Sequence, residues 1–331
     1  MVGTRTTSWK VHVLSVLAGV LAALLVVLTG AGTRLSFALY DAAMRRLAAA
    51  TSVNAEAGRI AQGLDDPASL VLVEIDQQSL EWVQHELALG WPWPRELYGV
   101  MARFFRFARV QTFDILFSET SVYGPDDDAR CAAAMEEAGN VVVARTLAAP
   151  SRIAAPHIAS GHVQAVLDQD GMARRYMLWI ARDGERLPSL GLASLQKAGW
   201  TIPESLASKQ HVRLRFDEDV RFRKLSAAEV LHAAMHPATS SLTPEGFRNA
   251  IVVAGLTAPG LLDRQAVPVS AAYPGMRIHA TFIGNAMRGT FIEEAPWPAR
   301  GLVVIMLAVA GAALAMALAL GLEQSVRRHA L

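Results

Sequence analysis

Three aspartates lie at or just after the ends of short apolar segments that have the composition of buried strands. Asp76 ends LVLVEID, Asp114 lies in VQTFDILF, and Asp263 follows NAIVVAGL and the loop GLTAPG. In an open α/β sheet such positions meet beyond the carboxyl ends of the strands, where ligands bind. Grouped carboxylates there would contact a ligand or do acid–base chemistry. The alternative, which stays open, is that each aspartate caps a turn or pairs with an arginine.

A rigid aromatic pair and an arginine follow Asp76, in GWPWPRELYGVM, where Trp91 and Trp93 stand between prolines and directly before Arg95. The first proline favours an extended backbone at Trp91, and the second suits the first turn of a helix that begins with RELYGVM. Two interpretations are open: the rings pack over the helix start, or they form a ligand wall with Arg95 available to an anion. We expect Arg95 and Asp76 to share one polar cluster, with both tryptophans alongside.

Other reactive side chains lack the spacing that catalysis or metal binding requires. The sequence contains no G-x-S-x-G, H-E-x-x-H or C-x-x-C, and His157 and His162 are isolated. A helix cap explains the acids of PDDDAR more simply than a metal loop does, and GLTAPGLLD lacks the lysine of a P-loop. Cys131, the only cysteine, is a free buried thiol or an intermolecular bridge. We therefore predict no enzyme activity, no metal and no cofactor.

The segments around these residues alternate between strand and helix patterns. LVLVEID, VQTFDILF and NVVVAR are apolar runs typical of buried strands, and RELYGVMARFFRFARV and DDDARCAAAMEEAG between them have helical patterns. The order predicts a layered α/β fold with a mainly parallel sheet and flanking helices. Two segments indicate added hairpins, HVQAVLDQDGMARRYMLWIA and HVRLRFDEDVRFRKL. Three further helices are indicated by LSFALYDAAMRRLAAA, SAAEVLHAAM and GMRIHATFIGNAMRG. NAIVVAGL indicates another strand, and NAEAGRIAQGLDDP a loop.

Two charge-free apolar runs flank this domain, from Val11 to Gly32 and from Gly301 to Leu322. Each is long enough for a bilayer core, which about 20 helical residues span. We interpret the first run as an uncleaved anchor, because a signal peptide usually has an apolar part of only ~7–15 residues. The basic residues beyond the runs are Arg5, Lys10, Arg327 and Arg328. They predict cytoplasmic tails at 1–10 and 323–331 and an extracytoplasmic domain at 33–300 of a bacterial inner-membrane protein.

Charge and small residues limit the partners. The 31 Lys+Arg and 30 Asp+Glu nearly balance, which argues against nucleic acid, because nucleic acid calls for a basic face. In the second run Gly311, Ala315 and Ala319 recur every four residues, as Gly19 and Ala23 do in the first, so another helix can approach closely. We predict association through the spans, as a homodimer or with a separate signalling protein.

Several motifs together resemble the type-2 CHASE domain, a sensory domain found outside the membrane in bacterial cyclases and histidine kinases. They are VLVEIDQQSL, GWPWPR, VQTFDILFSE, AGNVVVAR, LDQDGMARR, LPSLGLASL, IVVAGLTAPGLLD and YPGMRIHATFIGNAM, and they extend from about Tyr40 to Phe291. The resemblance implies sensing. Receptors of this family typically continue into a cytoplasmic kinase or cyclase, whereas only EQSVRRHAL follows the second apolar run.

The combined expectation is a membrane-anchored extracytoplasmic sensor that binds an unidentified small ligand and signals through its spans to a separate partner. Two alternatives stay open. One is a structural membrane scaffold of a multiprotein complex, and the other is an extracytoplasmic enzyme that uses Asp76, Asp114 and Asp263.

Overall fold

The computed structural model describes residues 5–28, 30–58, 70–182, 184–216, 222–261, 264–293 and 297–329. The chain divides into two compact units. One unit is Ala43–Ile292, and the other combines Met1–Ala42 with Glu293–Leu331. We describe each unit by itself.

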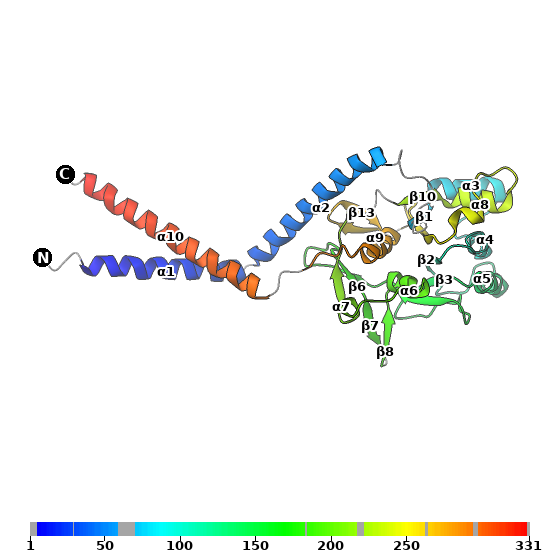
Figure 1. The fold of residues 1–331 in the computed structure, drawn as a ribbon, viewed down its shortest axis with the longest axis horizontal. Helices are drawn as coiled ribbons and strands as arrows, with labels where there is room; N and C mark the ends of the chain where they lie inside the picture. The colour runs from blue at the N-terminus through cyan, green and yellow to red at the C-terminus, as the bar shows by residue number, and fades with distance from the viewer. Residues whose placement is uncertain are drawn as a thin grey trace. The chain divides into compact units, whose positions relative to one another are not determined.

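A six-stranded parallel sheet forms the centre of the unit Ala43–Ile292, in the order β10-β1-β11-β2-β3-β4 (Figure 1). The apolar runs form these strands because their β-branched residues suit a sheet that is buried on both faces. The predicted strands and their parallel arrangement are confirmed. The bounds are β1 Leu70–Ile75, β2 Val110–Leu116, β3 Val141–Arg145, β4 Ala159–His162, β10 Arg223–Ser226 and β11 Ile251–Leu256.

Helices cover both faces of the sheet and enclose two hydrophobic cores. Successive residues of β1 alternate between these cores: Val71 and Val73 belong to one, and Leu72 to the other. The first core lies under α3 (Gln77–Leu87), α4 (Glu96–Phe104), α5 (Pro125–Ala138) and α8 (Ala227–Met235). The second lies under α6 (Leu190–Lys197) and α9 (Gly275–Arg288). Figure 1 shows these two sets of helices on opposite sides of the strands.

Short antiparallel pairs are added to this three-layer core. β5 (Ala165–Val166) pairs with β6 (Arg175–Met177), as the first hairpin pattern predicted. The second predicted hairpin is wrong, because β9 (His211–Arg213) pairs with β6 whereas β10 joins the parallel sheet beside β1. An alternating pattern suits a sheet edge as well as a hairpin, so it did not specify the partner. Its expected turn, at 217–221, lies outside the described residues.

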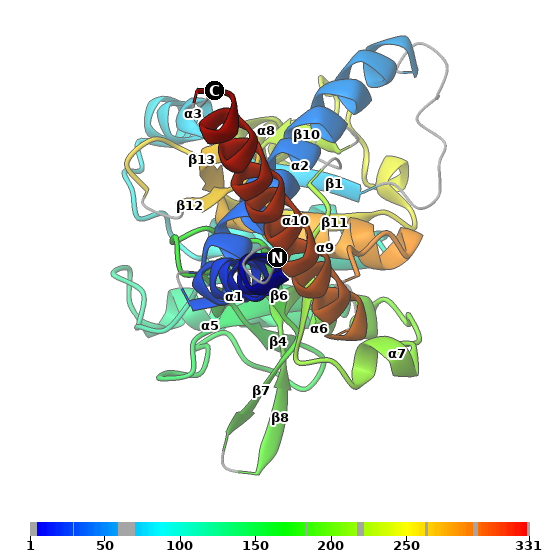
Figure 2. The ribbon, with the colours of Figure 1, turned by 90° about the vertical axis from the view of Figure 1, so that its left-hand side faces the viewer.

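The remaining short elements lie around these pairs. Figure 2 shows the β7–β8 hairpin projecting from the unit. The bounds are α7 Glu204–Ala207, β7 Trp179–Arg182, β8 Glu185–Pro188, β12 Arg264–Val267, β13 Ser270–Pro274 and the 3-10 helix η2 Pro244–Phe247.

The second unit is built from α1 (Arg5–Leu28), the start of α2 (Ala31–Gly58) and α10 (Trp297–His329). The helices α1 and α10 pack against each other (Figures 1 and 2). The expected loop NAEAGRIAQGLDDP is wrong at its start, because α2 continues to Gly58 through a segment rich in alanine; the rest of that loop lies outside the described residues.

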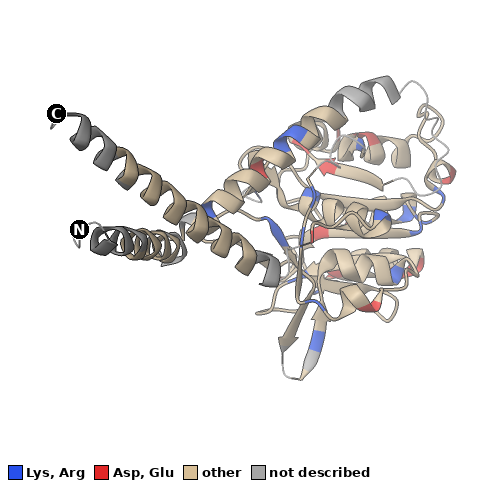
Figure 3. Ribbon diagram, turned by 60° about the vertical axis from the view of Figure 1, so that its left-hand side comes forward, with Lys and Arg blue, Asp and Glu red and all other residues tan. Residues whose placement is uncertain are grey.

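One described helix segment is long and apolar enough to cross a membrane, Gly301–Leu318 of α10. Figure 3 shows this part of α10 without charged residues, whereas charges are scattered over the sheet-containing unit. In α1 the described apolar segment Val13–Leu25 is shorter. Both predicted membrane spans therefore stay predictions.

Candidate functional site

A cavity of about 440 Å³ lies beyond the carboxyl ends of β2, β4 and β11, where the fold predicts a ligand site. Cavities of this size hold small molecules. The walls come from the sheet, from the β5–β6 pair and from the start of α9. Most of the lining residues are apolar, and they include Ile115, Leu116, Val166, Met177, Leu256 and Ile278.

Of the two predicted strand-end aspartates that the structure describes, Asp76 and Asp114, Asp114 lines this cavity. It accepts no hydrogen bond from the described residues, and its side chain is about nine-tenths buried. Burial raises the pKa of Asp114 to about 7, because the ionised carboxylate loses water and gains no compensating donor. The nearest ionisable neighbour is His279 of α9, whose Nε2 lies 3.7 Å from Oδ2 of Asp114. This separation is too long for a hydrogen bond.

A buried hydrogen-bond chain orients His279. The Gly191 N–H donates to the Tyr176 hydroxyl at 3.0 Å, and that hydroxyl lies 2.6 Å from Nδ1 of His279. Since an amide can only donate, the tyrosine oxygen accepts there, and the Ser189 side chain is a further hydrogen-bond partner of the same hydroxyl. The hydrogen bond at Nδ1 holds the ring so that Nε2 is the atom that faces Asp114.

His162, at the end of β4, lies near this chain. It is buried, its Nδ1 accepts from the Gln164 N–H at 3.2 Å, and its Nε2 has no partner among the described residues. Burial lowers the pKa of His162 to about 4, with a smaller contribution from His279. His162 is therefore neutral at physiological pH, and sequence reasoning had set it aside as isolated.

The positive charge in the cavity wall is already matched. Arg175 donates from Nε to Asp168 Oδ1 at 2.9 Å, and its Nη2 lies 2.7 Å from the same oxygen. The other oxygen of Asp168 accepts from the buried Arg174, which also pairs with Asp170 at 2.7 Å. The motif LDQDGMARR thus forms a network of two arginines and two aspartates with no net charge, of which Arg175 lines the cavity.

Asp76 lies outside this cavity and has a structural role. It is the N-cap of α3, and one carboxylate oxygen accepts from the Ser79 N–H at 2.8 Å, the Ser79 hydroxyl at 2.6 Å and the Ser226 hydroxyl at 2.9 Å. The capping alternative is therefore the one that holds for Asp76. Asp263 lies outside the described residues.

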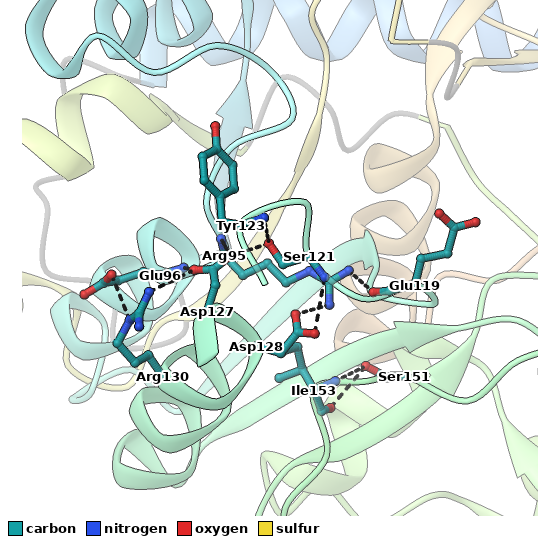
Figure 4. A network of polar contacts seen from close by, with 10 residues as sticks. All are labelled: Arg95, Glu96, Glu119, Ser121, Tyr123, Asp127, Asp128, Arg130, Ser151 and Ile153. Atoms are coloured by element: carbon teal, nitrogen blue, oxygen red, sulfur yellow. Dashed lines mark hydrogen bonds and ion pairs between the residues drawn. The ribbon is translucent and has the colours of Figure 1, made fainter. Parts of the chain in front are cut away.

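Arg95 belongs to a different polar cluster, shown in Figure 4, and its expected pairing with Asp76 is wrong. Its guanidinium pairs with Asp128 and donates to the main-chain oxygen of Glu119. The reason is that the acids in the first turn of α5 lie beside the start of α4. Asp127 accepts from the backbone N–H of Arg95 at 2.8 Å and of Glu96 at 2.9 Å, which gives α4 the cap that its own sequence lacks.

The two tryptophans of GWPWPR differ in environment. Trp93 is 2% exposed and belongs to the core, where its ring contacts Tyr98 at a centroid distance of 6.2 Å. Trp91 is 39% exposed, contacts Trp93 edge-on at 5.6 Å and lines the cavity. Trp93 therefore packs in the core, whereas Trp91 lies at the cavity and its contact with a ligand stays a prediction.

The other candidate residues are placed as follows. Cys131 is a free buried thiol, and burial raises its pKa to about 12, which makes it inert. Among the described residues no three His, Cys, Asp or Glu side chains gather as a metal site.

The candidate helix-association residues lie on α10. Gly311 and Ala315 are half-buried there, whereas the side chain of Ala319 is not among those that the structure describes.

The small-residue face of the first apolar run packs within the chain. A Cβ on Gly19 of α1 would lie 2.4 Å from the carbonyl oxygen of Ala308 and 2.7 Å from the nitrogen of Ala312 in α10. Ser15 and Ala23, four residues to either side, are also buried. Association between chains through these helices stays a prediction.

Sequence reasoning missed Tyr176 and His279. Tyr176 lies in the segment predicted as a hairpin, HVQAVLDQDGMARRYMLWIA, and His279 lies in YPGMRIHATFIGNAM, a motif that resembles the type-2 CHASE domain. The available signal was a histidine on a helix whose other positions from 278 to 286 are buried and mostly apolar. A titratable group on an apolar face needs a partner.

Comparisons with known proteins bear on this arrangement. Neither the curated proteins nor the solved structures gave a match. The CHASE2 domain family matches residues 17–317, which contain all the described residues that line the cavity. The chain belongs to the CHASE2 domain family.

Proposed function

We propose that this chain is a membrane-anchored extracytoplasmic sensor, which binds a small ligand in the cavity beside Asp114 and signals through α1 and α10 to a separate protein. CHASE2 domains are sensory extracellular domains, and the family supports this role. The observation that carries the proposal is Asp114, a desolvated carboxylate that opens into a largely apolar cavity and accepts no hydrogen bond from the described residues. Burying a carboxylate without a hydrogen bond costs free energy, and a ligand that donates a hydrogen bond to it would recover that cost.

Chain connectivity supports the signalling part of the proposal. The helix α9 lines the cavity with Gly275, Ile278 and His279, and the chain continues from Ile292 towards α10. The Ile292 N–H donates to the Arg213 oxygen at 3.1 Å, which ties this exit to β9. A ligand that contacts α9 therefore acts on the segment leading into α10. It would shift α10 only if it binds two arrangements with different affinity.

The chemistry of the lining supports binding over turnover. Among the described residues that line the cavity there is no serine, threonine, cysteine or lysine to act as a nucleophile. The tyrosine hydroxyl already bonds to Gly191 and His279. We therefore propose that the ligand leaves the cavity unchanged.

A compound screen on the full-length chain in nanodiscs tests the proposal. We expect a small molecule to raise the unfolding temperature and to change the distance between spin labels on α1 and α10. Ala165→Trp, which fills the cavity from β5, should abolish both effects. Ala154→Trp, on an exposed alanine outside the lining, is the matched control.

Two results would contradict the sensor. One is that no compound stabilises the wild-type chain, as expected for a scaffold. The other is that a compound acts equally on wild type and Ala165→Trp, which would place its site elsewhere.

A further inference from the structure

We propose that the ligand of this cavity is a small organic ammonium ion, whose charged nitrogen pairs with Asp114 and whose apolar part fills the space beside β2 and α9. This inference rests on the proposed function and names the chemical class that the sensor recognises. It is carried by the charges and hydrogen-bonding groups of the described cavity wall.

The charges of the wall favour a cation. Three lining residues can carry charge: Asp114, Arg175 and His279. The guanidinium of Arg175 is matched by Asp168 at 2.7 Å, and Nδ1 of His279 is hydrogen-bonded to the tyrosine hydroxyl at 2.6 Å. Among the described lining residues that can carry charge, Asp114 is therefore the one whose side chain makes no hydrogen bond; the Nε2 atom of His279 lies 3.7 Å from it. An anionic ligand would meet this carboxylate and find no uncommitted arginine or lysine among the described lining residues.

The shape and polarity of the wall favour an ammonium group on an apolar body. An ammonium nitrogen has several N–H donors, and Gln164 and Gln265, whose side chains contain an acceptor oxygen, also line the cavity. Trp91, which is partly exposed, also lines the cavity, and the faces of aromatic rings attract cations. The aliphatic residues cover the remainder. A metal cation would make no favourable contact with these apolar residues, because it binds oxygen and nitrogen ligands.

Three probes that share one apolar body separate the charge classes: benzylamine, benzyl alcohol and benzoate. Isothermal titration with the full-length chain in zwitterionic nanodiscs at pH 7.5, corrected with empty nanodiscs, measures each affinity. We expect benzylamine to bind at least about tenfold more tightly than benzyl alcohol, because hydrogen bonds to charged groups are stronger than neutral ones. Benzoate should bind more weakly than either probe.

Two substitutions locate the cation. Asp114→Asn keeps the shape and removes the charge, and it should weaken benzylamine binding about 10- to 100-fold while leaving benzyl alcohol within about threefold of wild type. Asp126→Asn removes an exposed carboxylate at the start of α5 and should leave both affinities unchanged. Trp91→Leu keeps an apolar wall and should weaken benzylamine binding several-fold through loss of the aromatic face.

The outcomes distinguish this inference from the sensor proposal. Benzyl alcohol or benzoate binding as tightly as benzylamine would overturn the ammonium class, as would an Asp114→Asn chain that binds benzylamine normally. Absence of benzylamine binding would also overturn it. If a compound from the screen still loses its effect in Ala165→Trp, the sensor proposal survives with a different ligand class. If no compound binds, both fail.

Discussion

Two neighbouring tryptophans have opposite roles, and the exposed fraction of each decides which role it has. Trp93 is enclosed by the core, whereas Trp91 is partly exposed at the cavity. Trp93→Ala should lower the free energy of unfolding by about 3–5 kcal/mol, as large-to-small core substitutions do. Trp91→Ala should cost much less. Urea unfolding of the full-length chain in detergent measures both, and equal losses would contradict this division.

Opposing titrations at Asp114 and His162 predict an unusual pH dependence. The pKa of Asp114 rises from 3.8 to about 7 on folding, so between these values the folded chain holds one more proton, and stability falls as pH rises. The pKa of His162 falls from 6.5 to about 4, so there the unfolded chain holds one more proton, and stability rises with pH. The two slopes nearly cancel between about pH 4 and 6.5.

Asp114→Asn should reveal the contribution of His162. With the carboxylate removed, stability should rise with pH across this range by up to about 1.4 kcal/mol per pH unit, the value for one proton. The measurement is the free energy of unfolding at several pH values, with Asp126→Asn as control. A variant whose slope matches that of wild type would show that Asp114 does not titrate in this range.

The start of α4 depends on a side chain from another helix. Asp127 of α5 accepts from the first amides of α4 and from the Ser121 hydroxyl, and these hydrogen bonds lower its pKa. Asp127→Ala should destabilise the domain by about 2 kcal/mol, since it removes a cap and leaves buried donors unpaired. Asp126→Ala, on the exposed neighbour, should change stability by less than about 0.5 kcal/mol. Chemical unfolding compares them, and equal effects would exclude the cap.

The packing of α1 on α10 predicts that Gly19 tolerates no side chain. Its added Cβ would overlap backbone atoms of Ala308 and Ala312, so the helices must separate. Gly19→Ala should lengthen the distance between spin labels at the exposed positions Leu17 and Ile305. Gly321→Ala is the control, because a Cβ there meets nothing within 4 Å. An unchanged distance in Gly19→Ala would argue that the pair is not formed in the membrane.

Sequence patterns predicted elements better than they predicted partners. The strands β1, β2 and β3 and the helices α4 and α5 were visible because apolar runs and helical spacing are local properties. The pairing of β10 with β1 was missed because an alternating pattern does not say which strand lies beside it. The cavity was only partly predicted for the same reason: Asp114 could be placed at a strand end, whereas its approach to His279 of α9 depends on the tertiary fold.

The whole chain is predicted to have both termini in the cytoplasm. The basis is the charge-free apolar runs and the basic residues beyond them. Reporter fusions after residue 331 and before residue 1 should both give cytoplasmic signals. A fusion in the exposed loop near Gly171 should report the outside and serves as the internal control. An external signal from either terminus would contradict the two-span topology.

The order of strands in the sheet determines when the domain can fold during its synthesis. The first strand, β1, lies between β10 and β11, and Leu70 pairs with Ile251. A nascent chain that has emerged only as far as β4 therefore lacks both neighbours of β1 and one neighbour of β2. Such open edges favour aggregation, and pairings this distant in sequence form slowly. The sheet can consequently be completed only after β11 has emerged, so the amino-terminal strands remain without their partners for most of the synthesis of the domain.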